Sequence, residues 1–197
     1  MEEANVGGGK KNAKIWRAWI VFLDESGISE QPPVRRTWAP RGQTPTVVHP
    51  FNWKKLSICS VIAYWWNGTK YRLFFRVVGG SYNDQKLISF LEQLMRQPCM
   101  NRLILLWDGL PAHRSQRMVE YLQQFKDRLR VVRLPAYTPE INPVEGLWAN
   151  IQGQELANRS VKDLGEMVDG VRDGFTRVHS ESWLLHSFLK HAGLSLD

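Results

Sequence analysis

Short apolar segments alternate with amphipathic ones along this chain, and their order predicts a layered α/β fold. Apolar runs at 18–23, 56–64 and 71–77 have the length and composition of strands. The Asn67-Gly68 pair between the second and third runs is typical of a hairpin turn, because glycine readily adopts the positive φ that such turns need. The first three strands are therefore expected to form an antiparallel meander.

Helical and strand-like segments alternate over the rest of the chain. Apolar residues recur there at helical spacing, and short apolar runs follow the first two helices. Helices are expected at 84–96, around 118–125, from Asn142-Pro143 onward, and at about 161–178 and 181–191, with strands at 103–107 and 129–134. Since a connecting helix lets two strands lie parallel, this order predicts a mixed five-stranded sheet with helices on both faces.

Two segments follow neither pattern. Residues 1–14 are polar and glycine-rich, so we expect a flexible N-terminal tail. Residues 26–53 contain five prolines and three arginines, which favours an extended, basic insertion loop. Loops of this length inside a domain are usually functional.

The charge balance indicates a polyanionic partner. Lys and Arg number 26 against 19 Asp and Glu, which gives a formal net charge of +7 and favours nucleic acid over a membrane. Cys59 and Cys99 lie far apart without a second thiol or histidine at ligand spacing, so we expect two buried thiols and neither a disulfide nor a zinc site. No apolar run is long enough to span a membrane and no signal peptide is recognisable, so a cytosolic location is expected.

Three carboxylates are candidates for a catalytic or metal-binding role. Asp24 and Asp108 each follow an apolar strand, and the carboxyl ends of parallel strands share one edge of a sheet, where ligand sites form. Either residue could instead be only a turn acceptor. Glu145 is the third residue of the helix opened by Asn142-Pro143, where a carboxylate can also serve simply to cap the helix.

Three acids gathered at one place repel each other unless a divalent cation compensates their charge. Oxygen ligands without thiolates or paired imidazoles suit Mg²⁺ or Mn²⁺. Two such ions about 4 Å apart can activate a nucleophilic oxygen and stabilise the leaving oxygen of a phosphodiester. The three acids therefore predict a magnesium or manganese site, with two ions as the expected number.

Four sequence blocks carry a family resemblance. VFLDESG, RRTWAPRGQTP, LLWDGLPAHRS and LPAYTPEINPVEGLW occur in this order within roughly residues 18–153. Together they resemble the signature blocks of the insertion sequence 630 family of bacterial transposases, which are relatives of the mariner elements. The joint occurrence is far more specific than any block alone.

The resemblance implies a ribonuclease H-like catalytic domain over residues 15–158, with a C-terminal helical extension over 159–197. It also implies a DDE triad of Asp24, Asp108 and Glu145 as catalytic residues and metal ligands. The implied activity is cut-and-paste transposition, in which water cleaves at the element ends and the freed 3′-hydroxyl attacks target DNA, usually at TA-containing sites. A homodimer is the family expectation, in the bacterial cytoplasm and associated with the nucleoid.

Family members of full length carry helix-turn-helix modules before the catalytic domain, and no segment of this chain reads as a recognition helix. The chain therefore resembles the catalytic half of a split transposase, which implies a separate DNA-recognition polypeptide as a partner. Arg35, Arg36 and Arg41 lie in the basic loop, where they either contact DNA phosphates or keep the loop soluble; the resemblance favours the DNA contacts.

Three further polar residues are candidates for supporting roles. His113 either helps to position a phosphate or a metal-bound water, or makes local hydrogen bonds near a helix start. Asn142 could orient the active-site backbone, although its capping role is sufficient to explain it. Glu25 points away from Asp24 if the strand continues, so we expect it not to be a metal ligand.

Two other functions remain compatible with these residues. A ribonuclease or junction resolvase on the same fold would hydrolyse nucleic acid without joining a 3′-hydroxyl end to a second duplex. A non-catalytic DNA-binding remnant of a transposon would bind DNA and show no metal-dependent product, although the presence of all three acids argues against decay.

Overall fold

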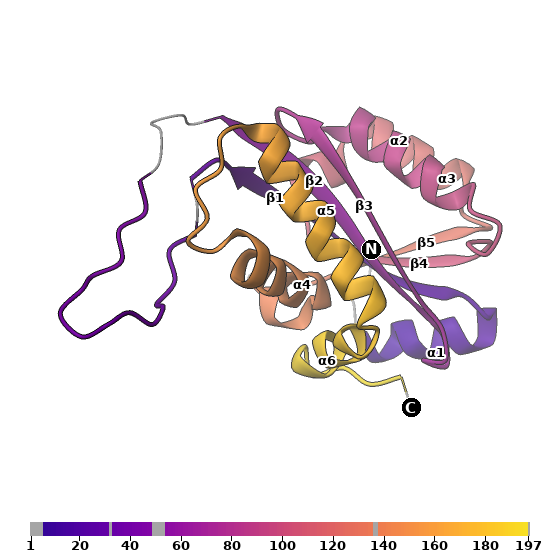
Figure 1. Cartoon of the computed structure of the whole chain (residues 1–197). Coiled ribbons are helices and arrows are strands. Elements are labelled where there is room, and N and C mark those ends of the chain that lie inside the picture. The colour runs from indigo at the N-terminus through magenta and orange to yellow at the C-terminus, as the bar shows by residue number, and fades with distance from the viewer. Residues whose placement is uncertain (1–5, 32, 49–53, 136–137, 197) are drawn as a thin grey trace.

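A five-stranded mixed sheet forms the centre of the molecule (Figure 1). The computed structural model describes residues 6–31, 33–48, 54–135 and 138–196. The strand order is β3-β2-β1-β4-β5, with the first three strands antiparallel and β4 and β5 parallel to β1. The strands are β1 (Trp19–Ser29), β2 (Lys55–Trp65), β3 (Tyr71–Gly79), β4 (Leu103–Trp107) and β5 (Leu129–Arg133). This arrangement confirms the mixed five-stranded sheet and the β2–β3 hairpin, in which Gly68 adopts a φ of +71°.

Two helices, one before and one after β4, cover one face of the sheet. These are α2 (Asp84–Met95) and α3 (Gln116–Gln124), which is preceded by a short 3₁₀ helix, η1 (Pro111–Arg114). Alternate residues of the strands, such as Val21, Leu23 and Leu105, pack beneath them in a buried cluster. The period of two along each strand therefore places every second residue of β1 against this face.

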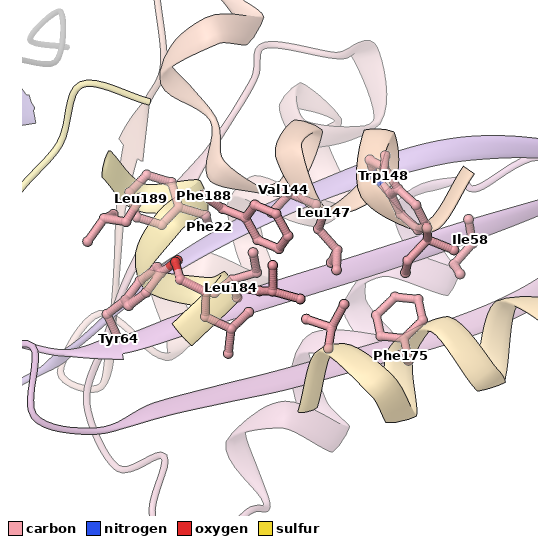
Figure 2. Close-up of a cluster of buried hydrophobic side chains, with 14 of the residues drawn as sticks. Phe22, Ile58, Tyr64, Val144, Leu147, Trp148, Phe175, Leu184, Phe188 and Leu189 are labelled. Atoms are coloured by element: carbon pink, nitrogen blue, oxygen red, sulfur yellow. The ribbon is translucent and has the colours of Figure 1, made fainter. Parts of the chain in front are cut away.

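Three later helices cover the opposite face: α4 (Pro143–Ile151), α5 (Leu164–Ser180) and α6 (Trp183–His191). Figure 2 shows Phe22, Ile58 and Tyr64 of the strands meeting side chains of all three helices. The Tyr64 hydroxyl donates a 2.7 Å hydrogen bond to the Leu185 carbonyl, which satisfies a buried polar group and ties α6 to the sheet. Short 3₁₀ and π-helical turns, η2 (Pro139–Ile141) and η3 (Gln152–Leu156), flank α4.

The N-terminal segment differs from the expected flexible tail. Residues Val6–Trp16 form α1, whereas residues 1–5 lie outside the described residues. Ala13 is fully buried, and the guanidinium of Arg130 lies 4.2 Å from the centroid of the Trp16 ring. These contacts to the folded body supply packing and cation–π stabilisation that the local composition does not reveal.

The first strand is longer than its apolar run. We expected it to end at Asp24, but β1 continues to Ser29 because β2 pairs with it along its full length. The parallel partner β4 stops earlier, and its last pair with β1 is Phe22–Leu106. Asp24 therefore lies inside a strand on its β2 side and beyond the end of pairing on its β4 side.

Residues 33–48 form an extended excursion that leaves the body of the molecule, as the dark purple trace in Figure 1 shows. The expected insertion loop 26–53 is thus partly strand, since its first residues belong to β1, and its residues 32 and 49–53 lie outside the described residues. Cys59 is buried as expected, whereas Cys99 is exposed in the turn after α2. Among the described residues, no helix combines the length and apolar character needed to cross a membrane.

Candidate active site

Asp24 occupies the middle of the sheet edge from which α4 begins. It alternates with Phe22 and so projects from the face that α4, α5 and α6 cover. Directly opposite on β2 lies Ser60, whose buried hydroxyl has no hydrogen-bond partner among the described residues. The site thus begins with a partly buried carboxylate beside a free hydroxyl.

Asp108 follows the last residue of β4, on the strand adjacent to β1. Its Oδ1 accepts a 3.1 Å hydrogen bond from the Leu110 N–H, two residues further along the chain. The same oxygen lies 2.9 Å from Nδ1 of His113. Because β1 and β4 are parallel neighbours, their carboxyl ends bring Asp108 to the same edge as Asp24.

Glu145 lies in the first turn of α4, and its helix is capped without it. Asn142 is the N-cap residue, and its side chain accepts a 3.2 Å hydrogen bond from the Val144 N–H. The Asn142 N–H donates to the Pro139 carbonyl at 2.9 Å, so the reciprocal capping bond anticipated for Glu145 is already supplied by the backbone. The exposed Glu145 carboxylate is therefore available for another role.

The charges of these acids converge on Asp24. Burial, followed by the charges of the neighbouring Glu145, Glu25 and Asp108 carboxylates, raises the pKa of the Asp24 carboxyl to about 8. Charges in a partly buried site are screened less than charges in open solvent. The Asp24 carboxyl therefore senses the charges of both Asp108 and Glu145, although 37 or more positions separate each of these acids from the next in the chain.

His113 and Glu25 extend this group on the opposite face of the sheet. His113 is 2% exposed and its ring stacks on Trp107, with a centroid distance of 4.0 Å and an interplanar angle of 2°. Its Nε2 lies 2.9 Å from Oε1 of Glu25, and its Nδ1 lies 3.0 Å from the main-chain oxygen of Asp108. The histidine therefore bridges β1 and the segment that follows β4.

This bridge changes the titration of His113 and of Asp108. Burial opposes protonation of His113, but hydrogen bonds to Asp108 and Glu25 raise its pKa to about 9. Burial likewise acts to raise the pKa of Asp108, yet the bonds from His113 and Leu110 hold it below its ordinary value. The imidazolium thus compensates part of the negative charge at this edge.

The polar groups present suit a hard divalent cation. Asp24, Asp108 and Glu145 offer carboxylate oxygens, the ligands that Mg²⁺ and Mn²⁺ prefer. The pKa of Asp24 is raised first by burial and then by the negative charge of the neighbouring carboxylates, which a bound cation would offset. Ligand atoms of Glu25, Asp108 and His113 also lie within 4.8 Å of one another. The donor set therefore fits the expected cation.

The three arginines of the basic loop differ in their contacts. Arg36 and Arg41 are exposed on the 33–48 excursion. Arg35 is engaged instead, because its N–H donates to the Asn158 side chain at 2.9 Å and its carbonyl accepts from the same side chain at 2.8 Å. Its guanidinium also reaches the Ala149 carbonyl at 3.4 Å. Arg35 therefore anchors the base of the loop, and DNA contact by the three arginines stays a prediction.

Glu25 is the site residue that sequence reasoning set aside. Strand alternation correctly places it on the other face from Asp24, but the segment after β4 folds under that face and carries His113 to it. Two features of the sequence could have indicated this pair. Glu25 directly follows Asp24 in the VFLDESG block, and His113 lies five positions after Asp108.

Comparisons with known proteins place the chain in a family. Residues 19–168 match a family model described as DDE superfamily endonuclease. Over 155 residues the chain is 26% identical to the uncharacterized 39 kDa protein of insertion element IS630 from Shigella sonnei, which covers 78% of this chain and 43% of that protein. The chain thus spans less than half the length of this relative.

Solved structures of Mos1 share the fold. The Mos1 mariner paired end complex with Mg matches with a TM-score of 0.65 and 19% identity, covering 98% of this chain and 61% of that chain. The corresponding complex with Mn gives a TM-score of 0.64 at 21% identity, covering 95% and 57%. The catalytic domain of Mos1 mariner transposase gives 0.53 at 18% identity, covering 98% and 90%. The fold is accordingly ribonuclease H-like.

The family model extends from the first residue of β1 to the first turns of α5, and so includes the three acids and the bridging histidine. This chain belongs to the DDE superfamily endonuclease family.

Proposed function

We propose that this chain is the catalytic domain of a DDE transposase, which cleaves the ends of a transposable element and joins them to target DNA. The observation that carries the proposal is the convergence of Glu145 and Asp108 on Asp24, whose pKa is raised by burial and by their charges. Further support comes from the family match and from the relative in an insertion element.

In this proposal Asp24, Asp108 and Glu145 hold Mg²⁺ or Mn²⁺, with two ions as the proposed number. Divalent cations at such a site lower the pKa of a bound water or hydroxyl and stabilise negative charge on a scissile phosphate. The similar Mos1 structures include paired end complexes with Mg and with Mn, which supports this choice of cation.

The chain's own side chains have distinct tasks in this reaction. Because the pKa of Asp24 is raised, cation binding at this carboxyl would be coupled to release of its proton. Glu145, in the first turn of α4, presents an exposed carboxylate as a ligand. Arg36 and Arg41 contribute exposed positive charge for phosphates of the DNA backbone.

The proposed substrates are the transposon ends and a target duplex, with TA-containing sites as the target. One similar structure is a Mos1 transposase paired-end complex with the left transposon end. We further propose that the protein works as a homodimer, and that a helix-turn-helix module, on a separate polypeptide, recognises the terminal repeats.

The test is a cleavage and joining assay with labelled transposon-end duplexes and a plasmid target in Mg²⁺ or Mn²⁺. Asp108→Asn should reduce both products by at least about 10³-fold, because it removes a charged cation ligand. Asp24→Asn and Glu145→Gln should have effects of the same order. The matched control is Asp173→Asn, an exposed carboxylate on α5 that should leave both products unchanged.

The alternatives give different results in the same assay. Hydrolysis of DNA or RNA without joining of a 3′-hydroxyl end would identify a nuclease or resolvase instead. DNA binding that survives replacement of all three acids, with no metal-dependent product from the wild type, would identify a binding remnant. Thermal unfolding of each variant checks that the fold is retained.

A further inference from the structure

His113 is held rigidly at the end of β4. Its ring stacks flat on the Trp107 ring, with a centroid distance of 4.0 Å, and its main-chain N–H donates to the Leu110 carbonyl at 3.0 Å. With only 2% of the residue exposed, the ring has no room for another rotamer without repacking. A rigid, buried ring of this kind can hold the polar groups that are hydrogen-bonded to it in fixed positions.

Both ring nitrogens are engaged by groups from different strands. Nδ1 lies 2.9 Å from Oδ1 of Asp108 and 3.0 Å from its main-chain oxygen. Nε2 lies 2.9 Å from Oε1 of Glu25, whose side chain is 10% exposed. The link therefore runs from β1, through the imidazole, to the carboxylate that follows β4.

The link to His113 restricts the orientation of the Asp108 carboxylate. Its side chain is 46% exposed and stands at the start of a loop, where a carboxylate ordinarily samples several orientations. Here Oδ1 is held by two contacts, from the His113 ring and from the Leu110 N–H. Rotation of the carboxylate would break both contacts, so the second oxygen, Oδ2, keeps one direction.

We propose that His113 is a positioning residue, which uses Glu25 as its anchor to fix the orientation of the Asp108 carboxylate toward the cation. This inference rests on the proposed function, in which Asp108 is a ligand. Partners behind metal ligands commonly change metal affinity by about 10- to 100-fold, because they orient the ligand before the cation arrives.

A direct role of His113 as a ligand is the competing possibility, since its ligand atoms and those of Glu25 and Asp108 are near one another. The bonding argues against it. Both ring nitrogens already have partners at 2.9 to 3.0 Å, so coordination would require one of these contacts to break inside a buried, stacked ring. Positioning uses the contacts as they are.

Two substitutions at His113 separate the two ends of the link. An asparagine amide can occupy the place of Nδ1, so His113→Asn preserves a donor for Asp108 and loses Glu25. A glutamine amide reaches the place of Nε2, so His113→Gln preserves the contact to Glu25 and loses Asp108. Both variants leave a similar gap beneath Trp107, so their losses of thermal stability should be alike.

The measurement is Mn²⁺ affinity by isothermal titration calorimetry on the whole chain, without DNA. We expect His113→Gln to bind Mn²⁺ about 10- to 100-fold more weakly than the wild type, and His113→Asn, which keeps the donor for Asp108 but loses the anchor, to bind only severalfold more weakly. Glu25→Ala, which retains the ring and removes its anchor, should weaken binding severalfold. His179→Gln, at an exposed histidine of α5, is the control and should not change the affinity.

Several results would overturn the inference. Equal affinities of the two His113 variants would mean that the histidine is only a packing residue, and an unchanged affinity in Glu25→Ala would exclude its anchoring role. Nitrogen coupling to bound Mn²⁺ in electron paramagnetic resonance, lost in both His113 variants, would identify a ligand instead. If Asp108→Asn still binds Mn²⁺ and cleaves DNA, the proposed function fails; if it loses both and the His113 variants match the wild type, only this inference fails.

Discussion

At the scale of single residues, Asp24 couples the charge of the site to the stability of the fold. Its pKa rises from an ordinary 3.8 to about 8 in the folded, metal-free protein, because of burial and then of the nearby carboxylates. Between these two values the folded state holds a proton that the unfolded state has lost. The stability associated with this proton is fully present below about pH 4 and is lost as the pH rises toward 8.

We therefore predict that Asp24→Asn stabilises the protein at pH 8 in the presence of a chelator. The gain should be on the order of a few kcal/mol, because each pKa unit corresponds to about 1.4 kcal/mol and relaxation of the site reduces the total. Urea unfolding between pH 4 and pH 8 should give a shallower decline for the variant than for the wild type.

Addition of Mn²⁺ at pH 8 should stabilise the wild type and have little effect on Asp24→Asn. Asp173→Asn serves as the control, and its pH dependence should follow that of the wild type. Parallel pH profiles for wild type and Asp24→Asn would show that Asp24 titrates normally in the folded protein.

At the scale of elements, close packing of α5 on the turns after α4 supports the helix that carries Glu145. The Arg177 guanidinium donates to Oε1 of Glu155 at 2.6 Å and to the Asn150 side chain at 2.7 Å. The helices approach closely at Gly174, where a Cβ would lie 2.9 Å from both Oε2 of Glu155 and Cγ2 of Ile151. Any larger residue at position 174 would therefore clash with these side chains unless they move.

Two effects oppose each other in Gly174→Ala. Helix propensity favours alanine by about 1 kcal/mol, whereas overpacking a tight contact costs about 1–3 kcal/mol. Because the neighbours include a charged oxygen held by Arg177, we expect packing to dominate and the variant to lose about 1–2 kcal/mol of unfolding free energy in urea.

The control for this substitution is Asp173→Ala, at the exposed neighbouring position of the same helix. It raises helix propensity without a packing contact, so its unfolding free energy should stay equal to that of the wild type or increase slightly. A stabilised Gly174→Ala would mean that α5 can move away from the turns after α4 at little cost.

At the scale of the whole molecule, the net charge of +7 and the excursion over 33–48 give the protein a basic arm. Figure 1 shows this segment reaching away from the sheet, while Arg35 and Asn158 tie its base to the body. Arg36 and Arg41 are left exposed on the arm. Exposed arginines that meet DNA phosphates release counterions, so their contribution depends on salt.

We predict that Arg36→Ala and Arg41→Ala each reduce the slope of log K against log salt concentration by about 1, measured by fluorescence anisotropy with a DNA duplex. Arg96→Ala is the matched control, because Arg96 follows α2 before β4 begins, at the sheet edge opposite Asp108. Equal slopes for all the variants would exclude phosphate contacts by the arm.

The local sequence was sufficient to predict the elements that depend on short-range pattern. The apolar runs, the helical periodicity, the Asn67-Gly68 turn and the Asn142 cap all appear in the structure as expected. Each of these features depends on the residue itself and a few neighbours, so its physical cause is contained in a short window of sequence. The positions of Asp24 and Asp108 at one sheet edge followed from the order of the strands.

Features that depend on distant partners required the tertiary structure. Pairing with β2 extends β1 through Asp24 to Ser29, and burial of Ala13 orders a helix in a segment that composition alone describes as flexible. The bridge between Glu25 and His113 joins residues 88 positions apart, one on β1 and the other in η1. The sequence by itself determined which acids are present and which strands carry them, whereas only packing and sheet pairing decided their surroundings, because burial and charge depend on atoms brought together from the whole chain.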